Sequence, residues 1–262
     1  IQLINIFVTY CFLNILYKHI LKFQSRTIAN LLLASLSTTM VVQFHYNFGA
    51  YPDILCYFFL LLTFINKERP VSPYIFFFIA LLTKETAIFT ALFFLALKNF
   101  SKMKLLLSCV LYLPIYLSLN TGSYNLEHYL TPLQSDLMYW INQSKPFIVT
   151  GYFSSIKYLW IVVILYIFRD FRNSYPVILL ILGISLQFML GGDTTRFVSF
   201  IFLGLIFVVE KLKLDKFLFL NIFILFLNIV TAKYYVFAYG EMIILNESRL
   251  SFLNFFEIFN EN

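Results

Sequence analysis

Residues 177–210 read VILLILGISLQFMLGGDTTRFVSFIFLGLIFVVE, two apolar runs separated by the short polar gap GGDTTR at 191–196. A membrane-spanning helix needs roughly 20 mainly apolar residues, and each run supplies 14 of them. The two glycines suit the end of one helix, and Asp193 or Thr194 suits the N-cap of the next. This stretch therefore predicts two membrane helices joined by a tight hairpin.

The rest of the chain has the same character. Of 262 residues, 61% are hydrophobic and only 12% are charged, which excludes an ordinary soluble domain because its surface must stay wettable. The net charge of +6 is scattered in short clusters between apolar runs, so it does not indicate nucleic-acid binding. We predict an all-α, polytopic membrane protein with about 9–10 transmembrane or partly inserted helices.

The apolar segments divide the chain into a predicted helical transmembrane domain at 1–233, with one long loop at 120–146, and an amphipathic tail at 234–262. The segments are 1–17, 27–44, 52–66, 71–83, 84–97, 104–119, 147–168, 176–190, 195–210 and 216–233. The chain begins at Ile1 inside an apolar run, so we expect its natural N-terminus to lie upstream. The three cysteines each fall in an apolar segment and are expected to act as small buried hydrophobes.

Positive charge assigns the sides of the membrane. Alternate turns, at 18–26, 66–70, 98–104, 169–172 and 211–216, hold 13 of the 19 basic residues, and basic turns stay in the cytoplasm. The polar interruptions 44–53, 82–86 and 191–196 then emerge together on the opposite side, as do the long loop and the tail. We expect the functional face to be that non-cytoplasmic side.

Three candidate positions on that face carry ionisable side chains. The first turn of a helix is partly positive, so an arginine at Arg196 is not required by the hairpin and is a candidate to hold an anion such as phosphate. Headgroup contact and pairing with Asp193 are the structural alternatives. LTKET repeats the arrangement, with Thr83 as a plausible N-cap and Lys84 and Glu85 in the first turn.

GAYPDILCYF, at 49–58, starts another helix on the same side. Asp53 complements the helix dipole there, which is an adequate structural reason for it, and it is also a candidate general base. His45 and Tyr51 lie nearby as further candidates. No His, Cys or acidic residues show metal-ligand spacing, so we predict no metal and no cofactor.

The helix start at YPD, the basic turn after it, FFFIALLTKETAIFTALFFLAL at 76–97 and GGDTTRFVSFIFLGLIF at 191–207 together resemble the membrane core of C-type (GT-C) glycosyltransferases, over roughly residues 27 to 210. The resemblance implies a multi-pass helical enzyme, expected in a bacterial inner (plasma) membrane. Such an enzyme moves a sugar from a polyprenyl-phosphate carrier to a lipid, glycan or protein acceptor on the non-cytoplasmic face, with inversion.

Carried onto this sequence, the resemblance implies that Lys84 and Arg196 hold the lipid phosphate, and that Asp53, Glu85 and Asp193 position them or the acceptor. The acid of the family's first outer loop should precede the first basic turn. It is therefore either upstream of Ile1 or missing from a degenerate relative.

Two other classes of function remain open from the sequence. A transporter or lipid flippase would use the outer anion site as an entry vestibule, although such proteins usually carry ionisable groups near the bilayer midplane. The second open class is a non-catalytic membrane subunit. Formation of a new glycosidic bond separates the glycosyltransferase from both.

Overall fold

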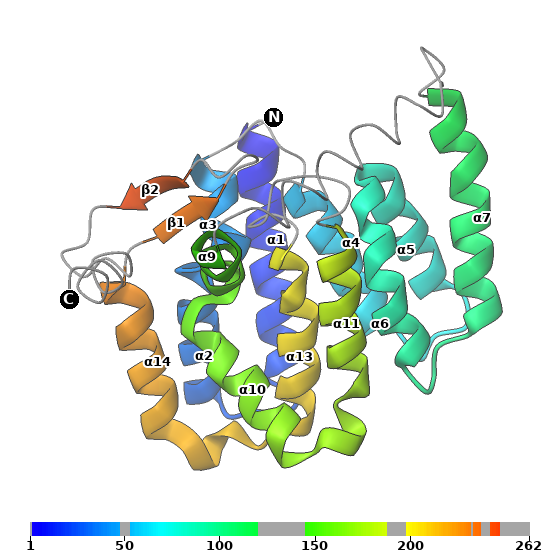
Figure 1. Cartoon of the computed structure of the whole chain (residues 1–262). Coiled ribbons are helices and arrows are strands. Elements are labelled where there is room, and N and C mark those ends of the chain that lie inside the picture. The colour runs from blue at the N-terminus through cyan, green and yellow to red at the C-terminus, as the bar shows by residue number, and fades with distance from the viewer. Residues whose placement is uncertain are drawn as a thin grey trace.

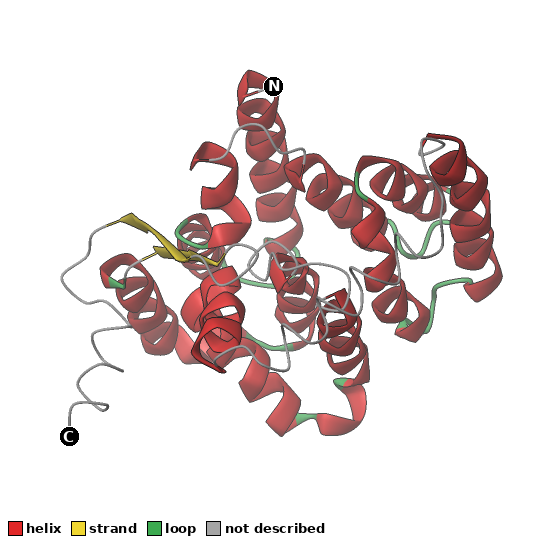
Figure 2. Cartoon of the chain, turned by 45° about the horizontal axis from the view of Figure 1, so that its top comes forward, coloured by secondary structure: helices red, strands yellow, loops and turns green. Residues whose placement is uncertain are grey.

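The structure is a computed structural model, and it describes residues 2–47, 53–119, 145–187, 198–231, 233–236 and 242–246. In that part of the chain, the helices pack into one bundle, and a short β-hairpin lies at the side of the bundle (Figures 1 and 2). The α-helices are α1 (Gln2–Ile20), α2 (Arg26–Ser37), α3 (Met40–Asn47), α4 (Asp53–Ile65), α5 (Ser72–Thr83), α6 (Ala91–Ala96), α7 (Lys102–Leu119), α9 (Lys145–Ile156), α10 (Trp160–Arg169), α11 (Tyr175–Leu186), α13 (Phe202–Lys211) and α14 (Leu218–Val230).

Short 3-10 helices extend or join these helices. They are η1 (Glu85–Thr90), η2 (Lys157–Leu159), η3 (Phe171–Asn173), η5 (Ser199–Ile201) and η6 (Leu214–Phe217). The predicted helical fold is confirmed for the part of the chain that the structure describes. Most predicted apolar segments coincide with one helix to within a few residues, because their composition leaves no competing strand or turn pattern.

Two predicted segments are broken. The segment 27–44 becomes α2 and α3, because the hydroxyls of Thr38 and Thr39 bond the carbonyls of Ser35 and Leu36 at the end of α2. The segment 147–168 is interrupted at Lys157, whose φ of 48° lies in the left-handed region. The buried Lys157 Nζ donates to the carbonyl oxygens of Asn228 and Thr231, each at 2.8 Å, at the C-terminal end of α14.

An antiparallel hairpin of β1 (Lys233–Val236) and β2 (Met242–Asn246) adds a small β element that the all-α prediction did not contain. Its register is irregular between Lys233 and Tyr234. The hairpin occupies the first part of the predicted amphipathic tail, whose residues 247–262 lie outside the described ranges.

The core is aromatic and centres on α13, where every residue from Phe202 to Val209 is buried. A helix that is apolar on all sides is expected at the centre of a bundle. Tyr57 of α4 contacts Phe200 and Phe202 edge-on or tilted, and Phe12 of α1 meets Phe202 edge-on at 5.5 Å. These ring contacts hold α1 and α4 against α13.

The outside of the bundle is also apolar. On α7, at the edge of the bundle in Figure 1, Leu106, Leu107 and Val110 are each more than half exposed, and Phe219 on α14 is 87% exposed. Two helical spans among the described residues, Gln2–Ile20 and Val149–Arg169, are long and apolar enough to cross a membrane. Length and composition alone are weak grounds for membrane insertion, whereas exposed apolar surface of this extent marks a lipid or protein contact.

The five basic turns lie together at one end of the bundle, which we call the basic end. Lys22, Lys67, Lys98, Asp170 and Lys211, one from each turn or its flank, line a common cavity. In Figure 1 the turns after α1, α10 and α13 lie at the lower side. Because α4 starts at Asp53 and ends beside Lys67, Asp53 lies at the opposite end.

Candidate functional site

Lys84 occupies the junction between two short helices at the end opposite the basic turns. It follows the last residue of α5 and precedes η1, with an extended backbone at φ −157° and ψ 118°. Its backbone N–H still bonds the carbonyl of Ala80, so α5 ends here without a loop. The predicted interruption at LTKET is therefore a sharp break between two helices.

Asp53 and Lys84 form a buried ion pair. Asp53 is the first residue of α4 and is fully buried, and Lys84 is 8% exposed. The Lys84 ammonium donates to the Asp53 carboxylate across 31 positions of sequence. A charged pair taken from water costs desolvation energy that only close contact and further bonds offset. The sequence predicts both residues on the same side of the membrane, and in the structure their side chains are in contact.

Two further buried side chains near this end carry polar atoms that have no hydrogen-bond partner among the residues that the structure describes. They are the Thr86 hydroxyl on η1 and both amide atoms of Gln187, directly after α11. The backbones of α11 and η1 approach closely, since a Cβ added at Gly183 would lie 2.2 Å from the Phe89 carbonyl oxygen. Because Gln187 is one turn beyond Gly183 and Thr86 one turn before Phe89, the helical register places them on facing sides of an antiparallel contact. Unsatisfied buried polar groups are uncommon in folded proteins.

Glu85 is the first residue of η1, and its side chain is exposed rather than part of the ion pair. The predicted N-cap role of Thr83 is wrong: Thr83 ends α5 and its hydroxyl donates back to the Ile79 carbonyl at 2.8 Å. Lys84 takes the N-cap position of η1 without a side-chain capping bond.

The remaining predicted site residues fall outside what the structure describes. Asp193 and Arg196 lie in 188–197, and Tyr51 lies in 48–52. His45 belongs to α3, but its side chain is not among those described. The structure therefore brings together Asp53 and Lys84 from the predicted set, with Glu85 adjacent along the chain.

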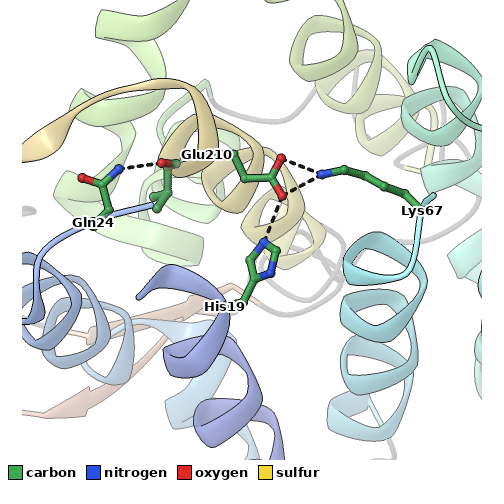
Figure 3. Close-up of polar contacts among 5 residues, drawn as sticks. His19, Gln24, Lys67 and Glu210 are labelled. Atoms are coloured by element: carbon green, nitrogen blue, oxygen red, sulfur yellow. Dashed lines mark hydrogen bonds and ion pairs between the residues drawn. The ribbon is translucent and has the colours of Figure 1, made fainter. Parts of the chain in front are cut away.

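A second cluster, at the basic end, was not predicted. Glu210, in the last turn of α13, accepts a hydrogen bond from His19 Nε2 at 2.9 Å and two from Lys67 Nζ at 2.5 and 2.6 Å (Figure 3). The Lys67 ammonium also lies 3.9 Å from the centre of the Phe64 ring. The Gln24 amide donates at 2.6 Å to the carbonyls of Val209 and Leu212, which fixes the end of α13 beside this cluster.

These three side chains border a cavity of about 640 Å³. His19 is 6% exposed, and its second ring nitrogen, Nδ1, has no hydrogen-bond partner in the described part of the chain. Burial lowers the pKa of Lys67 from its ordinary value of 10.5, and the hydrogen bonds and charge of Glu210 oppose that effect. The cluster thus joins one carboxylate to two potential cations and leaves one nitrogen unused.

One signal in the sequence pointed to this cluster. A carboxylate in the last turn of a helix faces the negative end of the helix dipole, so Glu210 requires cationic partners. The same reasoning selects Arg196 at a predicted helix start. His19 and Lys67 carry no sequence signal that distinguishes them from neighbouring basic residues.

Comparison with models of protein families, with curated protein sequences and with solved structures found no match for this chain. Function must therefore be inferred from the two sites themselves. Among the described residues, no three His, Cys, Asp or Glu side chains are grouped as a metal site would require.

Proposed function

We propose that the chain is a multi-pass membrane glycosyltransferase that uses a polyprenyl-phosphate sugar as donor and a lipid, glycan or protein hydroxyl as acceptor. The observation that carries the proposal is the buried Asp53–Lys84 pair at a junction of two helices, with exposed Glu85 as the next residue. A positioned ammonium can stabilise a departing phosphate, and a nearby carboxylate can accept the proton of an acceptor hydroxyl. The bacterial plasma membrane as its location comes from the sequence resemblance.

Membrane insertion is supported by the apolar exterior. A helix such as α7, with exposed Leu106, Leu107, Val110 and Leu111, would be unfavourable in water. The common location of the basic turns supports one cytoplasmic end, and by the same rule the Asp53–Lys84 pair would face the other side.

The proposed reaction assigns a role to each of three residues. The acceptor oxygen forms a bond to the anomeric carbon of the sugar while the bond from that carbon to the phosphate oxygen breaks. Lys84 stabilises the negative charge on the departing polyprenyl phosphate, and Asp53 fixes the position of the Lys84 ammonium. Glu85 accepts the proton of the acceptor hydroxyl, because its carboxylate is exposed and adjacent. The buried amide of Gln187 and hydroxyl of Thr86 supply hydrogen bonds for sugar or acceptor.

The test is transfer of radiolabelled sugar from a polyprenyl-phosphate donor to membrane lipid acceptors by the purified chain in proteoliposomes. Wild type should form a labelled product with a new glycosidic bond of inverted configuration. Glu85→Gln should lower kcat by about 10²- to 10⁴-fold without changing Tm, because general base catalysis contributes that much and the side chain is exposed.

Two variants control for trivial effects. Asp215→Asn changes an exposed acid at the basic end and should retain full activity. The double variant Asp53→Leu/Lys84→Met removes both charges, so it should fold but fail to transfer sugar. Donor moved across the bilayer with no glycosidic bond formed would refute the enzyme and support a transporter. Full activity in Glu85→Gln would remove Glu85 from the mechanism.

A further inference from the structure

The cavity at the basic end is separate from the site proposed for sugar transfer. Its volume of about 640 Å³ falls within the range of small-molecule pockets. It lies at the end of α4 opposite Asp53, and the 13 residues of α4 rise roughly 20 Å, so the two sites are distinct.

The hydrogen bonds inside the cavity define what a ligand must offer. A carboxylate can only accept, so the bond of His19 Nε2 to Glu210 means that Nε2 carries the proton. In the neutral ring, Nδ1 is then an acceptor, and it is buried with no partner among the described residues. A group with an N–H or O–H, such as a ligand hydroxyl, would satisfy it. The two hydrogen bonds from Lys67 keep Glu210 occupied, so that His19 stays oriented.

The charged side chains that line the cavity determine which charge a ligand should carry. The acids Glu68 and Asp170 accept hydrogen bonds from Asn99 and Asn173. Lys22 and Lys98 line the cavity, are exposed, and form no ion pair among the described residues. With Lys67 and Glu210 compensating each other, three lysines face two acids, since Lys211 also lines the cavity. The excess is one positive charge, which favours an anion.

We propose that this cavity binds a hydroxyl-bearing phosphate ester, with the hydroxyl donating to His19 Nδ1 and the phosphate facing Lys22 and Lys98. The shared chemistry fits either a free polyol phosphate or the headgroup of a hydroxylated phospholipid. The proposal depends on the cavity alone and does not require the chain to transfer sugars.

The test measures binding to the purified full chain in phosphatidylcholine nanodiscs by titration calorimetry. The soluble probe is glycerol 3-phosphate, compared with inorganic phosphate and with glycerol. In a second arm, nanodiscs that contain phosphatidylglycerol are examined by native mass spectrometry for retained lipid. Binding of glycerol 3-phosphate above both comparators identifies a free ester as the ligand, whereas retention of phosphatidylglycerol alone identifies a headgroup.

Variants connect binding to the named residues. His19→Gln places an amide N–H where Nε2 was and removes the Nδ1 acceptor, so it should weaken binding about fivefold, the value of one hydrogen bond. Lys22→Ala and Lys98→Ala should each weaken binding several-fold, with a steeper loss at low salt. They are exposed and should fold normally. Lys18→Ala, an exposed lysine of the same turn that does not line the cavity, should bind as wild type does.

The outcomes that would overturn the proposal are equally specific. One is that glycerol 3-phosphate binds no better than inorganic phosphate or glycerol and that phosphatidylglycerol is not retained. The other is that Lys22→Ala and Lys98→Ala both bind like wild type, because the phosphate would then not lie at the mouth.

Discussion

Removing either member of the Asp53–Lys84 pair should destabilise the protein far more than removing both. Asp53 is fully buried and Lys84 is 8% exposed, so a single substitution leaves an uncompensated buried charge. Such changes cost about 3–5 kcal/mol, whereas replacement of a buried pair by apolar residues is often neutral. Asp53→Leu and Lys84→Met should therefore each cost about 3–5 kcal/mol, and the double variant about 0–2 kcal/mol, including the lost interaction of Asp53 with the helix dipole.

Cys56 supplies the assay. It lies one turn after Asp53 in α4 and is fully buried, whereas Cys11 and Cys109 are half-buried and can be replaced by alanine. The rate at which a thiol reagent labels Cys56 in mixed micelles of rising SDS content reports opening of this end of the bundle. A cost of about 3–5 kcal/mol raises the open population by roughly two to four orders of magnitude.

The result that refutes this reasoning is additivity. If the double variant is destabilised by the sum of the two single changes, the side chains are not energetically coupled. The matched control is Lys102→Met, the same chemical change at an exposed lysine of α7, which should alter the labelling rate little.

Three further predictions concern the helix contacts and the basic end. In thermal unfolding, Gly183→Ala should destabilise the protein by about 1–3 kcal/mol, because the new Cβ would lie 2.2 Å from a backbone oxygen. Gly204→Ala is the matched change, and its nearest atoms are side-chain carbons at 3.3 Å. It should change stability by less than about 1 kcal/mol. Lys157→Met should cost about 1.5–3 kcal/mol in the same assay, because two carbonyls of the α14 end lose a charged donor. Folding lowers the pKa of Lys67, so between that lowered value and 10.5 the unfolded chain binds more protons than the folded chain. The free energy of unfolding of the wild type should therefore rise with pH across this window. In Lys67→Met it should rise less.

The sequence predicted the helical segments well, because apolar composition alone defines them. Residues 71–97 illustrate this: the polar stretch TKET at 83–86, between two apolar runs, predicts the break at Lys84. The breaks at Thr38 and Lys157 were not predicted. Each depends on a local hydrogen bond or on a distant acceptor, such as the Asn228 carbonyl, and neither changes the hydropathy pattern.

The candidate sites were likewise predicted only in part from the sequence. Helix-dipole reasoning selected Lys84 and gave Asp53 a structural reason, and the pattern of positive charge placed both at one end. Their contact depends on how α4 and α5 pair, which periodicity does not specify. His19, Lys67 and Glu210 are separated by up to 191 positions and meet only because three helix ends converge. Glu210 alone carried a signal, as an acid at a helix C-terminus.

The proposed sugar transfer depends on one claim, that the Asp53–Lys84 end and the basic end lie on opposite sides of a membrane. Labelling of single engineered cysteines with a membrane-impermeant maleimide tests it most directly, in a chain whose Cys11, Cys56 and Cys109 are replaced by alanine. The reporters are the exposed positions Glu85, at the start of η1, and Lys102, at the start of α7. In spheroplasts, Glu85→Cys should be labelled without permeabilisation and Lys102→Cys only after it. Equal labelling of both before permeabilisation, or the reverse order, would contradict the account.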